Sequence, residues 1–376
     1  MPRFPVRFAA LSCALIVAST LASCSSEPSE DVQTTQRTPE FSPLTTPTSP
    51  SPRTGSSAGA GSGEGEPTEP KQTPEKQTPD SEQPTVEPSA GSETGTSQER
   101  SDGPAASRTR GAAKLPTGDE KILNGRRMVA LYGAPGTPSL GALGEQPPGK
   151  AVKRVKRLAS KYADLTKDDV VPAFELIATV ASTSAGHDRD FSSELPLSTL
   201  RPWVERAAKE GVYVVLDLQP GRSDFVSQAK KYAPLLKYPN VGLALDPEWR
   251  LGPKQKHLEQ IGSVHGSEVN DTIDWLADLT RRNDLPQKLL VLHQFRTSMI
   301  ANRKVVQTDR DEVSVLIHAD GQGTQPAKRG TWKTLHKGAP KGVRWGWKNF
   351  IDEDHPTLTP KQTYQVTPRP DFVSYQ

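Results

Sequence analysis

The fold of this chain is predicted by one stretch near its middle, Val241-Gly242-Leu243-Ala244-Leu245-Asp246-Pro247-Glu248-Trp249-Arg250. Successive side chains of a β-strand point to opposite faces. One face then carries Gly242, Ala244, Asp246 and Glu248, and the other carries the two leucines. This pattern is typical of a parallel barrel, in which small residues face a crowded interior and leucines face the surrounding helices. The acids follow the strand, and the active groups of such barrels lie at the carboxyl ends of the strands. The alternative is that Asp246 caps a turn and Glu248 is solvated.

Apolar runs of this kind recur throughout the region 121–376. They lie at 128–132, 171–180, 212–218, 241–245, 289–295, 313–317, 343–350 and 371–375. Between most of them, apolar residues recur at helical spacing, at 150–162, 199–209, 224–236 and 267–282. Alternating strands and helices over this length predict a TIM-like (β/α)₈ barrel domain. Helical patterns are weak at 297–310 and 331–338 and missing after the last strand. We therefore expect an irregular barrel without its last helix.

The N-terminus predicts export. Two arginines precede an apolar run at 8–21, followed by Leu21-Ala22-Ser23-Cys24. This pattern indicates a signal peptide at 1–23 that is too short to span a membrane. The last four residues resemble the lipobox of bacterial lipoproteins. The resemblance implies cleavage before Cys24, attachment of a diacylglyceryl group to its sulfur, and anchoring in the bilayer on the extracytoplasmic face of the cell membrane. The alternative is an ordinary cleaved signal with a chance cysteine nearby.

Composition limits the remaining possibilities. The other cysteine, Cys13, lies in the signal peptide, so we expect no disulfide and no thiol ligand for a metal. Residues 24–120 are rich in Ser, Thr, Pro, Gly and Glu, which predicts a disordered linker with a root-mean-square reach of about 50 Å. The net charge of +3 is mild and does not indicate nucleic-acid binding. No Gly-x-Gly-x-x-Gly follows the first strand, so we expect no dinucleotide cofactor. We expect a monomer.

Polar residues gather where the predicted strands end, on the side of the barrel that carries active sites. The candidates, in chain order, are Glu175, Asp217, Gln219, Arg222, Asp246, Glu248, Trp249, Arg250, His293, Gln294, Arg296, His318, Asp320, Trp347 and Lys348. Burying several carboxylates costs stability unless partners or a ligand compensate, so this accumulation indicates a functional site. Each residue also has a structural interpretation: a lone histidine can be a satisfied core residue, and a tryptophan can pack in the core.

Tryptophans beside carboxylates suggest a carbohydrate ligand, because aromatic rings stack on the apolar faces of sugars while carboxylates bind their hydroxyl groups. The folded region also resembles barrel glycoside hydrolases whose acid/base carboxylate follows strand four, and Glu248 matches that position. In that clan an Asn precedes this Glu and a nucleophilic Glu follows strand seven. Here Pro247 stands before Glu248, and the segment after the seventh strand offers Glu353.

A second resemblance concerns location. The strings at 216–222 and 245–250 look like those of an uncharacterised group of surface lipoproteins from high-GC Gram-positive bacteria. Together, these features predict a lipid-anchored hydrolase of an envelope or extracellular glycan. Glu248 would be the general acid, and Asp217 or Asp246 the base or nucleophile, with no cofactor and no metal.

Two alternatives remain open. The first is a metal-dependent hydrolase, whose candidate ligands are Glu175, Asp217, Asp246, His293, His318 and Asp320. It is weakened because the first strand carries no His-x-His pair. The second alternative is a glycan-binding lipoprotein without catalysis, since barrels host many functions.

Overall fold

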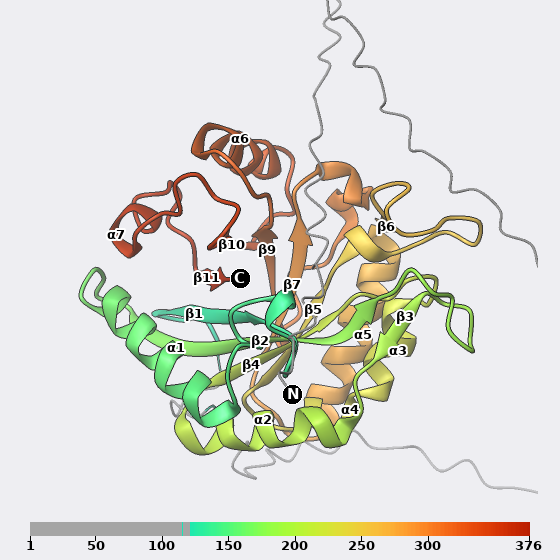
Figure 1. Cartoon of the computed structure of the whole chain (residues 1–376), viewed down its shortest axis with the longest axis horizontal. Coiled ribbons are helices and arrows are strands. Elements are labelled where there is room, and N and C mark those ends of the chain that lie inside the picture. The colour runs from blue at the N-terminus through green and yellow to red at the C-terminus, as the bar shows by residue number, and fades with distance from the viewer. Residues whose placement is uncertain (1–114, 116–120) are drawn as a thin grey trace, which may run out of the picture. The chain divides into compact units, whose positions relative to one another are not determined.

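The computed structural model describes Leu115 and residues 121–376; the expected signal peptide, Cys24 and nearly all of the linker lie outside the described residues. Eight parallel strands form a closed barrel (Figure 1). They are β1 (Arg126–Gly133), β2 (Asp169–Ala181), β4 (Tyr213–Leu218), β5 (Val241–Leu245), β7 (Lys288–Gln294), β9 (Val313–Ala319), β10 (Arg344–Asn349) and β11 (Phe372–Tyr375). The barrel closes because β1 pairs with both β2 and β11. The predicted (β/α)₈ fold is confirmed, and each of the eight apolar runs overlaps a barrel strand.

The connections between the strands are partly irregular, as expected. The α-helices are α1 (Pro148–Ala163), α2 (Leu197–Glu210), α3 (Phe225–Lys231), α4 (Ala233–Leu236), α5 (Gly266–Arg282), α6 (Gln325–His336) and α7 (Pro360–Thr363). The single helix predicted at 224–236 is interrupted after Lys231, and Pro234 lies at the start of α4. Proline interrupts a helix because it has no backbone N–H and its ring clashes with the preceding helical turn. The weak pattern at 331–338 belongs to α6, which begins earlier than the pattern suggested.

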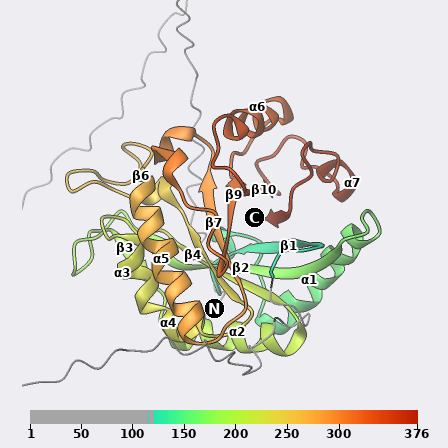
Figure 2. The same ribbon diagram turned by 180° about the vertical axis from the view of Figure 1, so that it is seen from behind.

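Between β7 and β9 the chain forms no α-helix. Instead it forms the short 3₁₀ turns η3 (Thr297–Met299) and η4 (Arg303–Val305), with β8 (Ile300–Ala301) between them. Strand β8 pairs with β6 (Val264–His265), and β3 (Ser192–Glu194) pairs antiparallel with β2. Figure 2 shows α2, α4 and α5 on one side of the barrel and α6 and α7 on the other.

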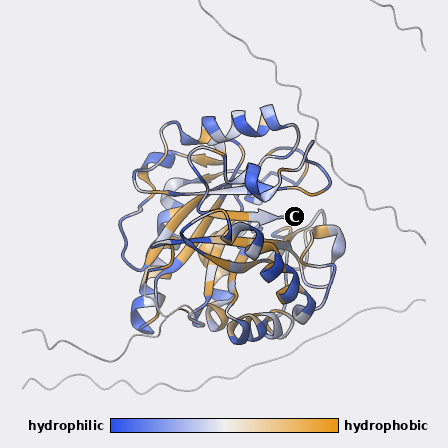
Figure 3. Ribbon diagram, turned by 90° about the vertical axis from the view of Figure 1, so that its left-hand side faces the viewer, coloured by the Kyte–Doolittle hydropathy of each residue, from blue (hydrophilic) through white to orange (hydrophobic). Residues whose placement is uncertain are grey.

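The stretch in β5 packs as its alternation predicts. Ala244 lies in the cluster of apolar side chains inside the barrel, whereas Leu243 and Leu245 lie in the cluster between strands and helices. A Cβ atom at Gly242 would lie 2.8 Å from Tyr213 Oη, so the interior has no room there for a larger residue. The hydropathy colouring in Figure 3 follows the same division, with apolar strands inside and polar helix faces outside.

At the end of the barrel where the strands begin, the interior is filled by apolar residues, including Leu115, Ile122 and Met128. No helix in the described part of the chain is both long enough and apolar enough to cross a membrane.

Candidate active site

Inward-facing polar side chains meet near the carboxyl ends of the barrel strands. We call this group the central cluster: Tyr132 (β1), Glu175 (β2), Asp217 (β4), His293 (β7), His318 (β9), Lys348 (β10) and Ser374 (β11), with Asp246 after β5 and Asp320 after β9. These side chains are all buried or nearly so. Period-two alternation places them inside, because they lie an even number of residues from positions that face the interior, such as Ala173 in β2, Ala244 in β5 and Leu316 in β9.

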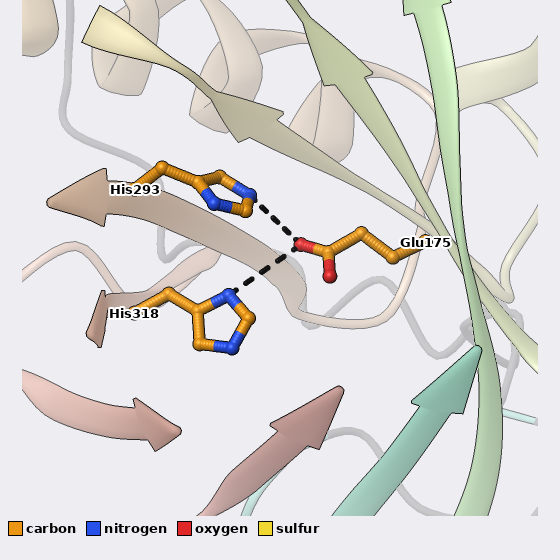
Figure 4. Close-up of side chains that lie close together, drawn as sticks. All are labelled: Glu175, His293 and His318. Carbon is orange, nitrogen blue, oxygen red and sulfur yellow. Dashed lines mark hydrogen bonds and ion pairs between the residues drawn. The ribbon is translucent and has the colours of Figure 1, made fainter. Parts of the chain in front are cut away.

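His293 is the hub of the cluster. Its Nδ1 lies 2.7 Å from Asp320 Oδ2, and its Nε2 lies 3.0 Å from Glu175 Oε1. Lys348 Nζ lies 3.1 Å from the other oxygen of Asp320. Figure 4 shows Glu175 reaching from β2 towards the two histidines. The imidazole therefore connects two carboxylates that come from opposite sides of the barrel.

A second set of contacts surrounds this hub. Tyr132 Oη donates a hydrogen bond to Asp217 Oδ2 at 2.8 Å, and Gln219 Nε2 donates to Tyr132 Oη at 3.4 Å. His318 Nε2 lies 3.3 Å from Ser374 Oγ. These contacts fix the positions of the Asp217 carboxylate and the His318 imidazole.

Several buried polar atoms of the cluster have no hydrogen-bond partner. Among the described residues these include Glu175 Oε2, Asp217 Oδ1 and His318 Nδ1. An unpaired buried polar group costs about 1–3 kcal/mol, so three of them in one place indicate a site that binds an ion, water or another ligand. Glu175, His293 and His318 each offer a ligand atom, and these atoms lie within 4.8 Å of one another. Among the described residues, these three form the fully buried group that could hold a metal ion.

The acids of the site differ in their protonation. Burial raises the pKa of Asp246 well above its usual value and raises that of Asp217 as well. Burial, followed by the negative charge of Asp320, raises the pKa of Glu248 to about 7. Burial opposes ionisation of Asp320 too, but Lys348 and His293 outweigh it and hold the pKa of Asp320 well below its usual range. Burial opposes ionisation of Glu175 as well, but His293 and His318 lower its pKa. The site thus combines acids whose pKa is raised with two, Asp320 and Glu175, whose pKa is lowered.

Glu248 lies at the mouth of the barrel, above the cluster, and is partly exposed. It sits in η2 (Pro247–Trp249), directly after β5, where Asp246 Oδ1 accepts a hydrogen bond from Glu248 N at 3.2 Å. The turn-capping interpretation of Asp246 is therefore correct, although Asp246 also belongs to the buried acid group. Arg250 fixes this segment to α5, because its guanidinium donates to both carboxylate oxygens of Glu268, at 2.9 and 3.1 Å.

Two predicted site residues point away from the cluster. Trp347 lies outside the barrel, where its ring centroid is 5.6 Å from that of Trp332 in α6. Gln294 accepts a hydrogen bond from Arg303 and donates to the Arg296 carbonyl, also outside the interior. Both side chains face outwards for the same reason: neighbouring strand residues face opposite sides, so an inward Lys348 or His293 forces its neighbour outwards.

Other candidates lie around the mouth without joining the cluster. Arg222 donates to the Gln255 carbonyl and stacks 4.3 Å from the Phe191 ring centroid. The Trp249 ring packs edge-on against His257, and Arg296 is exposed. The sequence reasoning missed Tyr132 and Ser374. The available signal was alternation: Tyr132 follows Met128 and Ala130 on the interior face of β1, and Ser374 follows Phe372 on that of β11.

The strand pairing and the cluster define the class: an α/β barrel with a polar site at the carboxyl ends of its strands. No protein-family model matches the chain, and no curated protein matches it. Among solved structures it is similar to oxaloacetate acetylhydrolase in complex with 3,3-difluorooxalacetate, at 13% identity over 67% of this chain and 75% of that chain, with a TM-score of 0.37. It is also similar to Xanthomonas albilineans dihydropteroate synthase with 4-aminobenzoic acid, at 14% identity over 67% and 88% of the two chains, with a TM-score of 0.30. Likenesses this weak carry no argument about function.

Proposed function

We propose that this protein is a lipid-anchored surface hydrolase that cleaves an envelope or extracellular glycan, with Glu248 as the general acid. The observation that carries the proposal is the state of Glu248: it is partly exposed at the barrel mouth, and its pKa is raised to about 7. A general acid works best when its pKa lies near the working pH, because it is then protonated and still able to give up the proton. Such a group can protonate the leaving oxygen of a glycosidic bond.

The second carboxylate is Asp320 rather than Asp217 or Asp246. Burial raises the pKa of the latter two, so each ionises less readily than Asp320. Asp320 is paired with Lys348 and His293, which favours its ionised form. It also acts electrostatically on Glu248. Its low pKa makes Asp320 a weak general base but keeps it ionised, so it serves as the nucleophile or as the charge that stabilises the oxocarbenium-like transition state.

A glycan substrate accords with the groups around the mouth. Trp249 and His257 provide aromatic surface near Glu248, and Arg222 and Arg296 provide hydrogen-bond donors for hydroxyl or carboxylate groups. The proposed location places such a substrate within reach, since a lipid on Cys24 followed by a long linker would hold the barrel outside the cell membrane.

Two experiments test the proposal. For the anchor, cells expressing the chain are labelled with palmitate; the label should follow the wild type and be lost in Cys24→Ser, and label that persists in the variant would contradict lipidation at this residue. For the activity, the purified chain is incubated with cell-wall and capsular polysaccharides, and new reducing ends are measured. Release from one glycan is expected. Binding without any release would support a non-catalytic receptor instead.

A further inference from the structure

We propose that Glu175, His293 and His318 together bind one divalent first-row transition metal ion, of which Zn²⁺ is the best-fitting example, in the centre of the barrel. The site does not include Glu248, and metal binding is measured without glycan cleavage, although Asp320 of the proposed mechanism also contacts the ligand His293. It joins β2 to the paired strands β7 and β9, in which His293 lies opposite His318.

The distances between the three side chains fit a coordination sphere. His293 Nε2 lies 3.0 Å from Glu175 Oε1, and His318 Nδ1 lies 3.8 Å from the same oxygen (Figure 4). Ligand atoms placed tetrahedrally at ordinary Zn–N and Zn–O distances lie about 3.4 Å apart. These two separations lie on either side of that value, and the two ligand nitrogens lie within 4.8 Å of each other, so side-chain movements would bring all three atoms onto one ion.

The pairing of His318 points to a ligand at Nδ1. Its other nitrogen, Nε2, is occupied by Ser374 Oγ at 3.3 Å. If Nδ1 carries no hydrogen, its lone pair faces the oxygen of Glu175, and the two acceptors oppose each other. If Nδ1 carries the hydrogen, 3.8 Å is too long for a hydrogen bond. Either tautomer leaves a fully buried nitrogen unsatisfied, and a cation between Nδ1 and Glu175 satisfies it.

The second ring nitrogen of each histidine has a hydrogen-bond partner of the kind found in metal sites. A metal-bound histidine usually hydrogen-bonds through its second nitrogen to a carboxylate or another polar group, which orients the ring. Here His293 has Asp320 behind it at 2.7 Å, and His318 has Ser374. Asp217 Oδ1, which is also unpaired, lies 3.9 Å from His293 Nε2 and adds negative charge beside the site. Two imidazoles and a carboxylate favour Zn²⁺ and its neighbours over Mg²⁺ or Ca²⁺, which prefer oxygen ligands.

Metal binding to the full chain, purified without a histidine tag and stripped with a chelator, tests the inference by calorimetry with Zn²⁺ and with Mg²⁺. We expect one Zn²⁺ per chain, bound at least 100-fold more tightly than Mg²⁺. His318→Gln should lose this binding. The control is Asp188→Asn, which alters the more exposed acidic group formed by Asp188, Asp190 and Glu194 and should leave the binding unchanged. Loss of binding in Asp188→Asn, or full retention in His318→Gln, would overturn the proposal.

A second measurement decides the matter if His318→Gln does not fold. Zn²⁺ added to the stripped wild type at about 100 times its dissociation constant should raise the melting temperature by several degrees, because it binds only the folded chain. No binding and no shift would refute the site. Glycan hydrolysis is measured separately, so failure of that activity leaves this result intact, and the reverse also holds.

Discussion

Lys348 Nζ lies 3.1 Å from Asp320 Oδ1 inside the barrel, with both side chains almost fully buried. Breaking a buried ion pair by removing one partner leaves an uncompensated charge, which typically costs about 3–5 kcal/mol. We therefore expect Lys348→Met to lower the free energy of unfolding by that order in urea titrations. The matched control is Lys121→Met, which removes an exposed pair with Asp311 and should cost less than about 1 kcal/mol. Equal effects of the two substitutions would contradict this role for Lys348.

The raised pKa of Glu248 predicts a pH-dependent stability. In the unfolded chain this carboxyl titrates near 4.5, and in the folded chain near 7. Between these values the folded chain holds a proton that the unfolded chain releases, so the free energy of unfolding falls as pH rises through the window. Glu248→Gln cannot titrate and should lose less stability between pH 4.5 and 7. Urea titrations at both ends of the window measure this; parallel profiles for the two proteins would show that the pKa is not raised.

Lys288 predicts the opposite slope at higher pH. It is the buried first residue of β7, its Nζ donates to the Tyr238 carbonyl at 2.6 Å, and burial lowers its pKa from 10.5 to about 7. Between pH 7 and 10.5 the unfolded chain binds the proton more strongly, so this residue makes the folded chain more stable as pH rises. Thermal melts of wild type and Lys288→Met at pH 7.5 and 9.5 isolate the effect: the wild type should gain stability relative to the variant.

The position of Trp347 separates stability from ligand binding. Trp347→Ala should cost about 3–5 kcal/mol, because it leaves a cavity between β10 and α6. Affinity for the glycan should not change under conditions where the variant is folded, since the ring faces away from the barrel interior. Equilibrium binding to the glycan that the wild type recognises is the readout. A large loss of affinity in a folded variant would show that Trp347 contributes to glycan binding.

The sequence was sufficient for the barrel because each buried strand is an apolar run with a turn or helix signal beside it. It was less informative for α6, whose buried face includes Lys328. That lysine donates to the carbonyls of Gly321 and Lys348 and pairs with Asp354. A charged residue is therefore buried at a position that the helical pattern assigns to the solvent-exposed face. Apolar periodicity cannot recognise a buried face stabilised by an ion pair.

The site was predicted in part for a related reason. Residue type identified His293, His318 and the acids, but it could not assign faces, and so Trp347 and Gln294 were included while Tyr132 and Ser374 were missed. The sequence alone also could not predict which acids have a raised pKa and which a lowered one. Asp217 and Asp320 are the same residue type, but in the fold burial shifts the pKa of Asp217 upwards, whereas Lys348 and His293 outweigh burial and shift that of Asp320 downwards.

The most direct test of the central claim compares the release of reducing ends from cell-wall and capsular polysaccharides by the wild type, Glu248→Gln and Glu259→Gln. Glu259 is an exposed acid in the same loop and serves as the control. The proposed mechanism predicts that Glu248→Gln lowers the rate at least 100-fold while Glu259→Gln retains it, because only Glu248 supplies the proton to the leaving group. Wild-type rates in a folded Glu248→Gln variant would contradict the assignment of Glu248 as the general acid.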